Sequence, residues 1–73
     1  MPDHIQAAQS LILRLNAPAQ FHSVWVRCEI NDDTGESKNI LCVSIRPEQL
    51  HKIKVPTEHL GFEVRQEPWP EGA

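Results

Sequence analysis

The middle of the chain contains two runs in which hydrophobic and polar residues alternate. The first run covers residues 21–30 and the second covers residues 38–46, and the segment between them contains Asn, Asp and Gly. A period of two is typical of strands that bury one face. The pattern therefore predicts a β-hairpin, whose buried positions are Val24, Val26, Cys28, Ile30, Leu41, Val43 and Ile45.

The register of this hairpin depends on its turn. A four-residue loop that ends at Gly35 gives this glycine a positive φ angle and places Glu29 opposite Lys38. A three-residue loop with a glycine bulge is the alternative, and it would move Cys42 to the buried face. With the four-residue loop, Cys28 and Cys42 point to opposite faces, which predicts free thiols and a reducing compartment.

The N-terminal residues 3–16 carry the pattern of an amphipathic helix. Asp3 and Gln6 have the spacing of a capping box, and Asn16 suits the left-handed position that ends a helix. An apolar stripe at helical spacing would pack on the hairpin. Its members are Ile5, Ala8, Leu11, Ile12 and Leu15.

The segment after the hairpin predicts one short helix and one turn. Pro47 suits the first turn of a helix over residues 47–53, with Leu50 and Ile53 on its buried edge. Residues 57–61 are expected to form one further capped turn that closes on a glycine. These elements would connect the hairpin to the last part of the chain.

The C-terminal part predicts a third strand and a tail. Phe62 and Val64 alternate with charged residues, in a strand that lies at an edge or follows a crossover. The tail over residues 67–73 has prolines on both sides of Trp69, and it cannot join a central strand because proline donates no ladder hydrogen bond. The predicted fold class is α+β in two layers: an N-terminal helix packed on a small antiparallel β-sheet, with a short helix or turn before the last strand. Residues 1–73 are predicted to form a single domain.

Composition narrows the classes of function. The chain has 73 residues, a hydrophobic content of 40% and a formal net charge of −3. This suits one small domain, and it does not suit a general binder of nucleic acid or anionic membranes. Because polar residues interrupt every apolar run, we expect no secretory leader, no membrane span and a cytoplasmic location.

The hairpin face turned away from the helix supplies the main candidate site. Trp25, Arg27, Ile40 and Cys42 share that face, and Trp and Arg are enriched at the centres of protein interfaces. Trp69, held stiffly between prolines, could present a second aromatic group to a partner. The alternatives are that the C-terminal segment covers the face and that Trp69 fastens the tail to the domain.

A basic segment over residues 46–54 is a second candidate. Arg46, His51, Lys52 and Lys54 could form a patch for an anionic partner. The alternation of these residues with apolar ones is also typical of an ordinary solvated face. No helix-turn-helix pattern, zinc-finger spacing or aromatic platform accompanies them, so we do not expect a nucleic-acid partner.

No catalytic motif accompanies these surfaces. The histidines and cysteines lack metal-ligand spacing, and the chain contains no phosphate loop, nucleophile elbow or dinucleotide motif. We therefore expect no enzyme, cofactor, metal or small-molecule substrate. The predicted function is protein binding by an accessory, adaptor or inhibitor module, of the kind that phage and mobile elements encode. We expect a homodimer joined through a sheet edge or the Trp25 face, and the alternative is a nucleic-acid-associated regulator that uses residues 46–54.

Overall fold

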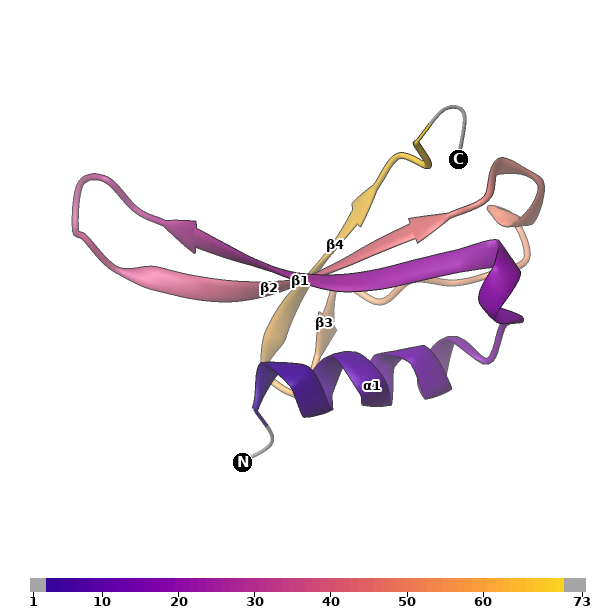
Figure 1. The fold of residues 1–73 in the computed structure, drawn as a ribbon, viewed down its shortest axis with the longest axis horizontal. Coiled ribbons are helices and arrows are strands. Elements are labelled where there is room, and N and C mark those ends of the chain that lie inside the picture. The colour runs from indigo at the N-terminus through magenta and orange to yellow at the C-terminus, as the bar shows by residue number, and fades with distance from the viewer. Residues whose placement is uncertain (1–2, 71–73) are drawn as a thin grey trace.

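One helix lies along one face of a four-stranded sheet in the computed structural model, which describes residues 3–70 (Figure 1). The helical elements are α1 (His4–Leu15) and two single 3₁₀ turns, η1 (Ala19–Phe21) and η2 (Pro47–Gln49). The strands are β1 (His22–Ile30), β2 (Ser37–Ile45), β3 (Glu58–His59) and β4 (Phe62–Glu67). This confirms the predicted two-layer α+β fold. Residues 71–73 of the predicted tail lie outside the described residues.

The sheet is mixed, so the prediction of an antiparallel sheet is wrong: its last long strand, β4, enters by a crossover and runs parallel to β2. The strand order is β1-β2-β4-β3, with β1 and β2 antiparallel, β2 and β4 parallel, and β3 and β4 antiparallel. Two neighbouring parallel strands need a connection that returns to the same end of the sheet, and residues 46–57 supply it. Of the two arrangements open from the sequence, the structure therefore has the crossover.

The hairpin has the register that the four-residue loop predicts. Glu29 lies opposite Lys38, and Gly35 has a φ angle of 74°. The Gly35 N–H donates to the carbonyl oxygen of Asn31 at 2.7 Å, which closes the turn. Since the register fixes which side chains share a face, Val24 of β1 lies on the same side as Val43 of β2 and packs against the core. The predicted burial of Cys28 and Ile30 is wrong, because both are exposed near the turn end of β1.

Both predicted helix caps are confirmed. The Gln6 N–H donates to Oδ1 of Asp3 at 2.8 Å, and the Asp3 N–H donates to Oε1 of Gln6 at 3.3 Å. At the other end Asn16 is left-handed, with a φ angle of 50°. The helix therefore begins and ends where its local sequence directs.

The predicted apolar stripe of α1 is correct for Leu11 and Leu15 but wrong for Ile5 and Ile12. The buried positions are Ala7, Leu11 and Leu15, whereas Ile5 is 57% exposed and Ile12 is 40% exposed. Compared with the prediction, α1 is rotated about its axis. The side that carries the small Ala7 faces the sheet, and Ser10 on the polar flank bonds to His59 of β3. Two isoleucines are left at the surface as a result.

The core lies between α1 and the central strands. Val64 of β4 joins it beside Leu41 of β2, and Ile53 and Val55 of the crossover pack against it. The buried members of this cluster are Ala7, Leu11, Leu15, Leu41, Val43, Ile45 and Val64.

The elements predicted between β2 and β4 are only partly present. The expected helix over 47–53 is the single turn η2, and Leu50 is half exposed. The expected capped turn over 57–61 is wrong, because this segment forms β3 and a two-residue hairpin loop instead. Leu60 and Gly61 both have positive φ angles, 52° and 86°, as a type I′ turn requires.

Candidate protein interface

The sheet face opposite α1, here called the second face, gathers the residues predicted from the hairpin. Trp25 lies beside Cys42, and Arg27 lies beside Ile40, as neighbours on β1 and β2. Because side chains alternate along a strand, every second residue of β1, β2 and β4 belongs to this face. Its members include Trp25, Arg27, Glu29, Lys38, Ile40, Cys42, Ser44, Glu63, Arg65 and Glu67.

Two of the predicted contact residues have no exposed surface. Ile40 and Cys42 are both 0% exposed, so the prediction that they stand at the surface is wrong. They occupy the central strand β2, and long side chains from the strands on either side extend above them. Ile40 and Cys42 therefore support the second face from below and cannot themselves contact a partner.

Ion pairs between β1 and β4 cover Ile40 and Cys42, here called the buried strip. Arg27 of β1 contacts Glu67 of β4 at 2.9 Å, and Arg65 of β4 contacts Glu29 of β1 at 2.6 Å. Since β2 lies between β1 and β4, both pairs must pass over it. The pairs join residues that are offset along the strands, which the twist of a sheet brings together.

A shared arginine ties these pairs into a network. The Arg65 guanidinium also contacts Glu63 at 2.7 Å, and Lys38 contacts the same carboxylate at 3.0 Å. Hydrogen bonds from Arg65 lower the pKa of the Glu29 and Glu63 carboxyls, and these bonds raise the pKa of Arg65. The side chains are more than one third exposed, so solvent screens each pair and the network contributes modestly to stability.

The two thiols differ in their surroundings. Cys42 is buried beneath the second face and Cys28 is exposed, and both are free cysteines as predicted. Burial raises the pKa of the Cys42 thiol, which keeps it in the unreactive neutral form. Cys42 is therefore a packing residue.

Trp69 and Arg46 meet at the end of the second face. The guanidinium carbon of Arg46 lies 5.3 Å from the centre of the Trp69 ring, within the range of a cation–π contact. The Ser44 hydroxyl lies 3.1 Å from the carbonyl oxygen of Glu67 and 2.9 Å from that of Pro68, and it holds the start of the tail. Two candidates that are far apart in the sequence, the tail tryptophan and the first residue of the basic segment, therefore lie in contact.

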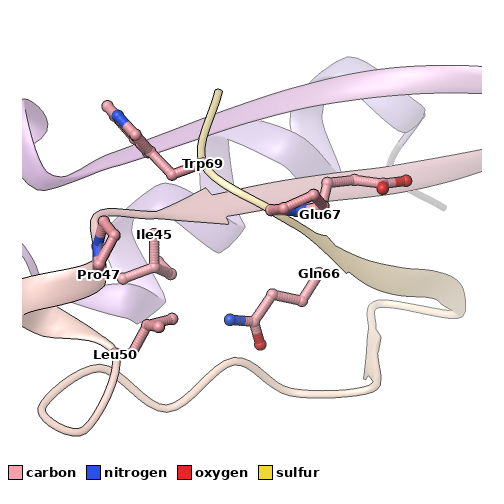
Figure 2. Close-up of a pocket in the computed structure, with 7 residues that line it drawn as sticks. Ile45, Pro47, Leu50, Gln66, Glu67 and Trp69 are labelled. Atoms are coloured by element: carbon pink, nitrogen blue, oxygen red, sulfur yellow. The ribbon is translucent and has the colours of Figure 1, made fainter. Parts of the chain in front are cut away.

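A hollow of about 540 Å³ lies beside Trp69, where the parallel strands β2 and β4 end (Figure 2). In Figure 2, Leu50 approaches from the segment after β2 and Gln66 approaches from β4. The lining residues are Ile45, Pro47, Leu50, Gln66, Glu67, Pro68 and Trp69. This hollow could not be predicted from the sequence, because only the parallel pairing of β2 with β4 brings its two halves together.

The rest of the basic segment lies in the crossover after η2. His51, Lys52 and Lys54 are exposed, and none of them takes part in an ion pair within residues 3–70. Arg46 differs from them, since it contacts Glu48 at 3.4 Å and its Nε is buried without a hydrogen-bond partner among the described residues. The predicted patch is therefore divided between Arg46 at the second face and three solvated side chains.

A histidine cluster on the helix side was not anticipated. His59 of β3 is buried, with Nδ1 3.0 Å from Nη1 of Arg14 and Nε2 3.0 Å from the hydroxyl of Ser10. A guanidinium can only donate, so Nδ1 must accept and the proton must reside on Nε2. Burial and then the charge of Arg14 lower the pKa of His59. The imidazole therefore donates to Ser10 and cannot act as its base, so the cluster fastens β3 to α1.

Comparisons with known proteins give no relative. No protein-family model, no curated protein and no solved structure matches the chain. Within the described part of the chain, no helix has the length and apolar character to cross a membrane. Residues 3–70 also contain no group of three or more His, Cys, Asp or Glu side chains that could hold a metal ion.

Proposed function

We propose that this protein is a non-catalytic binding module for another protein, and that it acts through the second face between Trp25 and Trp69. The proposal rests on one observation: each tryptophan is half-buried and shares this face with an arginine, Arg27 for the first and Arg46 for the second. Aromatic and arginine side chains on a rigid base are the usual anchors of protein interfaces.

The buried strip and its ion pairs support this role. A contact surface binds more tightly when its side chains are ordered before the partner arrives. Arg27 is held by Glu67, and Arg46 is held against Trp69, so both arginines are already positioned. Ile40 and Cys42, proposed from sequence as contact residues, take the role of packing beneath this surface.

The hollow beside Trp69 suggests the chemistry of the partner. Its walls include Ile45, Pro47 and Leu50, which would accept an apolar side chain. The Arg46 guanidinium lies against Trp69, which lines this hollow, and the Arg46 side chain is 39% exposed, so it favours a carboxylate on the partner. We propose an extended protein segment that carries an apolar and an acidic residue.

The proposed setting is the cytoplasm, where thiols stay reduced. Both cysteines are free, and they lie on opposite faces of the hairpin where they cannot pair with each other. The role would be that of an accessory, adaptor or inhibitor that covers a surface of its partner.

Affinity capture from the native host tests this function, with the wild type compared with Trp25→Ala, Trp69→Ala and the control Leu13→Ala. Leu13 is 80% exposed on α1, so its truncation removes a large apolar side chain far from the second face. We expect a protein that the wild type and the Leu13 variant retain and that both tryptophan variants lose. Equal capture by all four proteins, each checked as folded by circular dichroism, would contradict the proposal.

Nucleic-acid binding through the basic segment is the competing function, and the exposure of His51, Lys52 and Lys54 favours it. Salt separates the two functions, because phosphate contacts weaken steeply as salt rises and an apolar interface responds little. The double substitution of Lys52 and Lys54 by Glu should leave capture of the protein partner unchanged. Salt-sensitive binding of a labelled duplex that this double variant abolishes would support the competing function instead.

A further inference from the structure

The outer edge of β1 has unpaired backbone groups. β1 is the end strand of the sheet. Two hydrogen bonds show which of its residues direct their backbone groups to β2: the Arg46 N–H donates to the Phe21 carbonyl oxygen, and the Asn31 N–H donates to that of Glu36. Hydrogen-bonded positions alternate in an antiparallel pair, so odd-numbered residues of β1 direct their N–H and C=O groups to β2. The even-numbered residues direct theirs outward, where no backbone group within residues 3–70 receives them.

We infer that two copies of this chain pair antiparallel through β1, about a twofold axis at Val26. The strand runs from residue 22 to residue 30, so Val26 is its middle and also one of its outward positions. In this register Val26 exchanges hydrogen bonds with Val26 of the second copy, and Val24 does so with Cys28. The two sheets become one continuous sheet, and the contact is the self-complementary kind that closes a dimer.

The charges on β1 suit this register. Trp25 comes to lie beside Arg27 of the second copy, along its aliphatic stem, while the guanidinium stays paired with Glu67. Glu29 comes to lie beside Ser23, so no like charges are opposed. Sliding the second strand by two residues in either direction leaves the ends of the strand unpaired, and in one direction it also places the two Arg27 side chains opposite each other.

The exposed flank of α1 lies on the same side of the molecule. Ser10 and Arg14 reach His59 of β3, at the far edge of the sheet from β1. Successive residues of a helix turn by about 100°, so Ile12 lies on nearly the opposite side from Ser10. Ile5 shares that flank, and both isoleucines are more than one third exposed.

The dimer would cover this flank. α1 packs beneath β1 and β2, so a twofold axis beside β1 brings the two helices together on one face of the joined sheet. Their Ile5 and Ile12 side chains would then face each other. The inference thus explains an open strand edge and an unpartnered apolar flank with one occupant, a second copy. It does not depend on the function proposed for the second face.

Sedimentation equilibrium at high micromolar concentration tests the inference, with Cys28→Pro compared with Cys28→Ala. Cys28 is exposed and its N–H points outward, so proline removes a donor that the monomer does not use. We expect a wild-type dimer, an unchanged dimer for the alanine variant, and a dissociation constant raised about tenfold or more for the proline variant. A wild-type monomer, or a dimer that the folded proline variant retains unchanged, would overturn the inference.

Cross-linking tests the register separately. In the proposed pairing, Val24→Cys places a thiol opposite Cys28 of the second copy, at the distance that a disulfide spans. We expect mild oxidation to give a covalent dimer of the Val24→Cys protein and none of the matched Val24→Cys, Cys28→Ser protein. No covalent dimer from the single variant, or equal cross-linking of both, would overturn the register.

Discussion

The two faces of the sheet bury hydrophobic side chains by different means. On the helix side, Leu41 and Val43 lie beneath α1, in a cluster that includes Leu11. On the second face, Ile40 and Cys42 are equally buried beneath charged side chains from neighbouring strands. A layer of secondary structure excludes water whatever the pH, whereas a layer of ion pairs depends on the ionisation of its carboxylates. The same degree of burial therefore responds differently to solution conditions on the two faces.

The largest effect should come from a charge placed beneath the ion pairs. Ile40→Glu would bury an unpaired carboxylate, at a cost of about 3–5 kcal/mol. A single core in a chain of this length supplies about as much. We expect this variant to unfold, with loss of its circular dichroism signal at neutral pH. Ile40→Val is the matched control and should stay folded. A folded Ile40→Glu protein would mean that the second face opens easily.

A cavity on the helix side should have the next largest effect. Leu11 is completely buried, so Leu11→Ala should lower the free energy of unfolding by about 2–4 kcal/mol. Urea denaturation measures the loss. Leu13→Ala, on the exposed side of the same helix, is the control and should change the midpoint little. Equal effects of the two substitutions would contradict the orientation of α1.

Acid should weaken the second face, because its ion pairs need ionised carboxylates. The pKa values of Glu29 and Glu63 are lower in the folded protein than their ordinary value of 4.5. Their contribution to stability is therefore complete above about 4.5, and it is lost as the pH falls through the folded pKa values. Urea midpoints between neutral pH and pH ~3 should fall less steeply for Arg65→Gln than for the wild type. Parallel curves would show that the ion pairs do not stabilise the fold.

The smallest effect should appear at milder pH and on the helix side. Burial and the charge of Arg14 lower the pKa of His59 in the folded protein. The unfolded chain therefore binds a proton at this histidine near pH 6.5, whereas the folded protein binds it only at lower pH. Stability should thus decline as the pH falls below about 6.5 and level off below the folded pKa. His59→Asn should remove that part of the decline. An unchanged pH profile would mean that the imidazole is solvated.

Local sequence determines the parts of the fold that could be predicted. The caps at Asp3 and Asn16 and the turn at Gly35 involve residues close together in the chain, and each is found as expected. The rotation of α1 could not be foreseen, because the bonds from Ser10 and Arg14 reach a histidine far along the chain. Helical spacing alone allows either neighbouring stripe to be buried.

The sequence predicted which residues share the second face, but it did not predict which of them are exposed. Alternation placed Trp25 and Cys42 on one face, as found. The bond between Glu29 and Arg65, which helps to cover that face, exists only because β4 runs beside β2. The hollow at Trp69 depends on the same parallel pairing. The pattern of a hairpin carries no information about a strand that arrives by a crossover.

The turn between β1 and β2 extends beyond the N-terminal end of α1, far from the end of β4 (Figure 1). Asp33 and Thr34 at its tip are exposed, and Ile30 at its base is 68% exposed. A short peptide inserted between Asp33 and Thr34 would thus project into solvent at little cost to folding. This tip is the natural place for a fluorophore or an affinity handle that leaves the rest of the surface accessible.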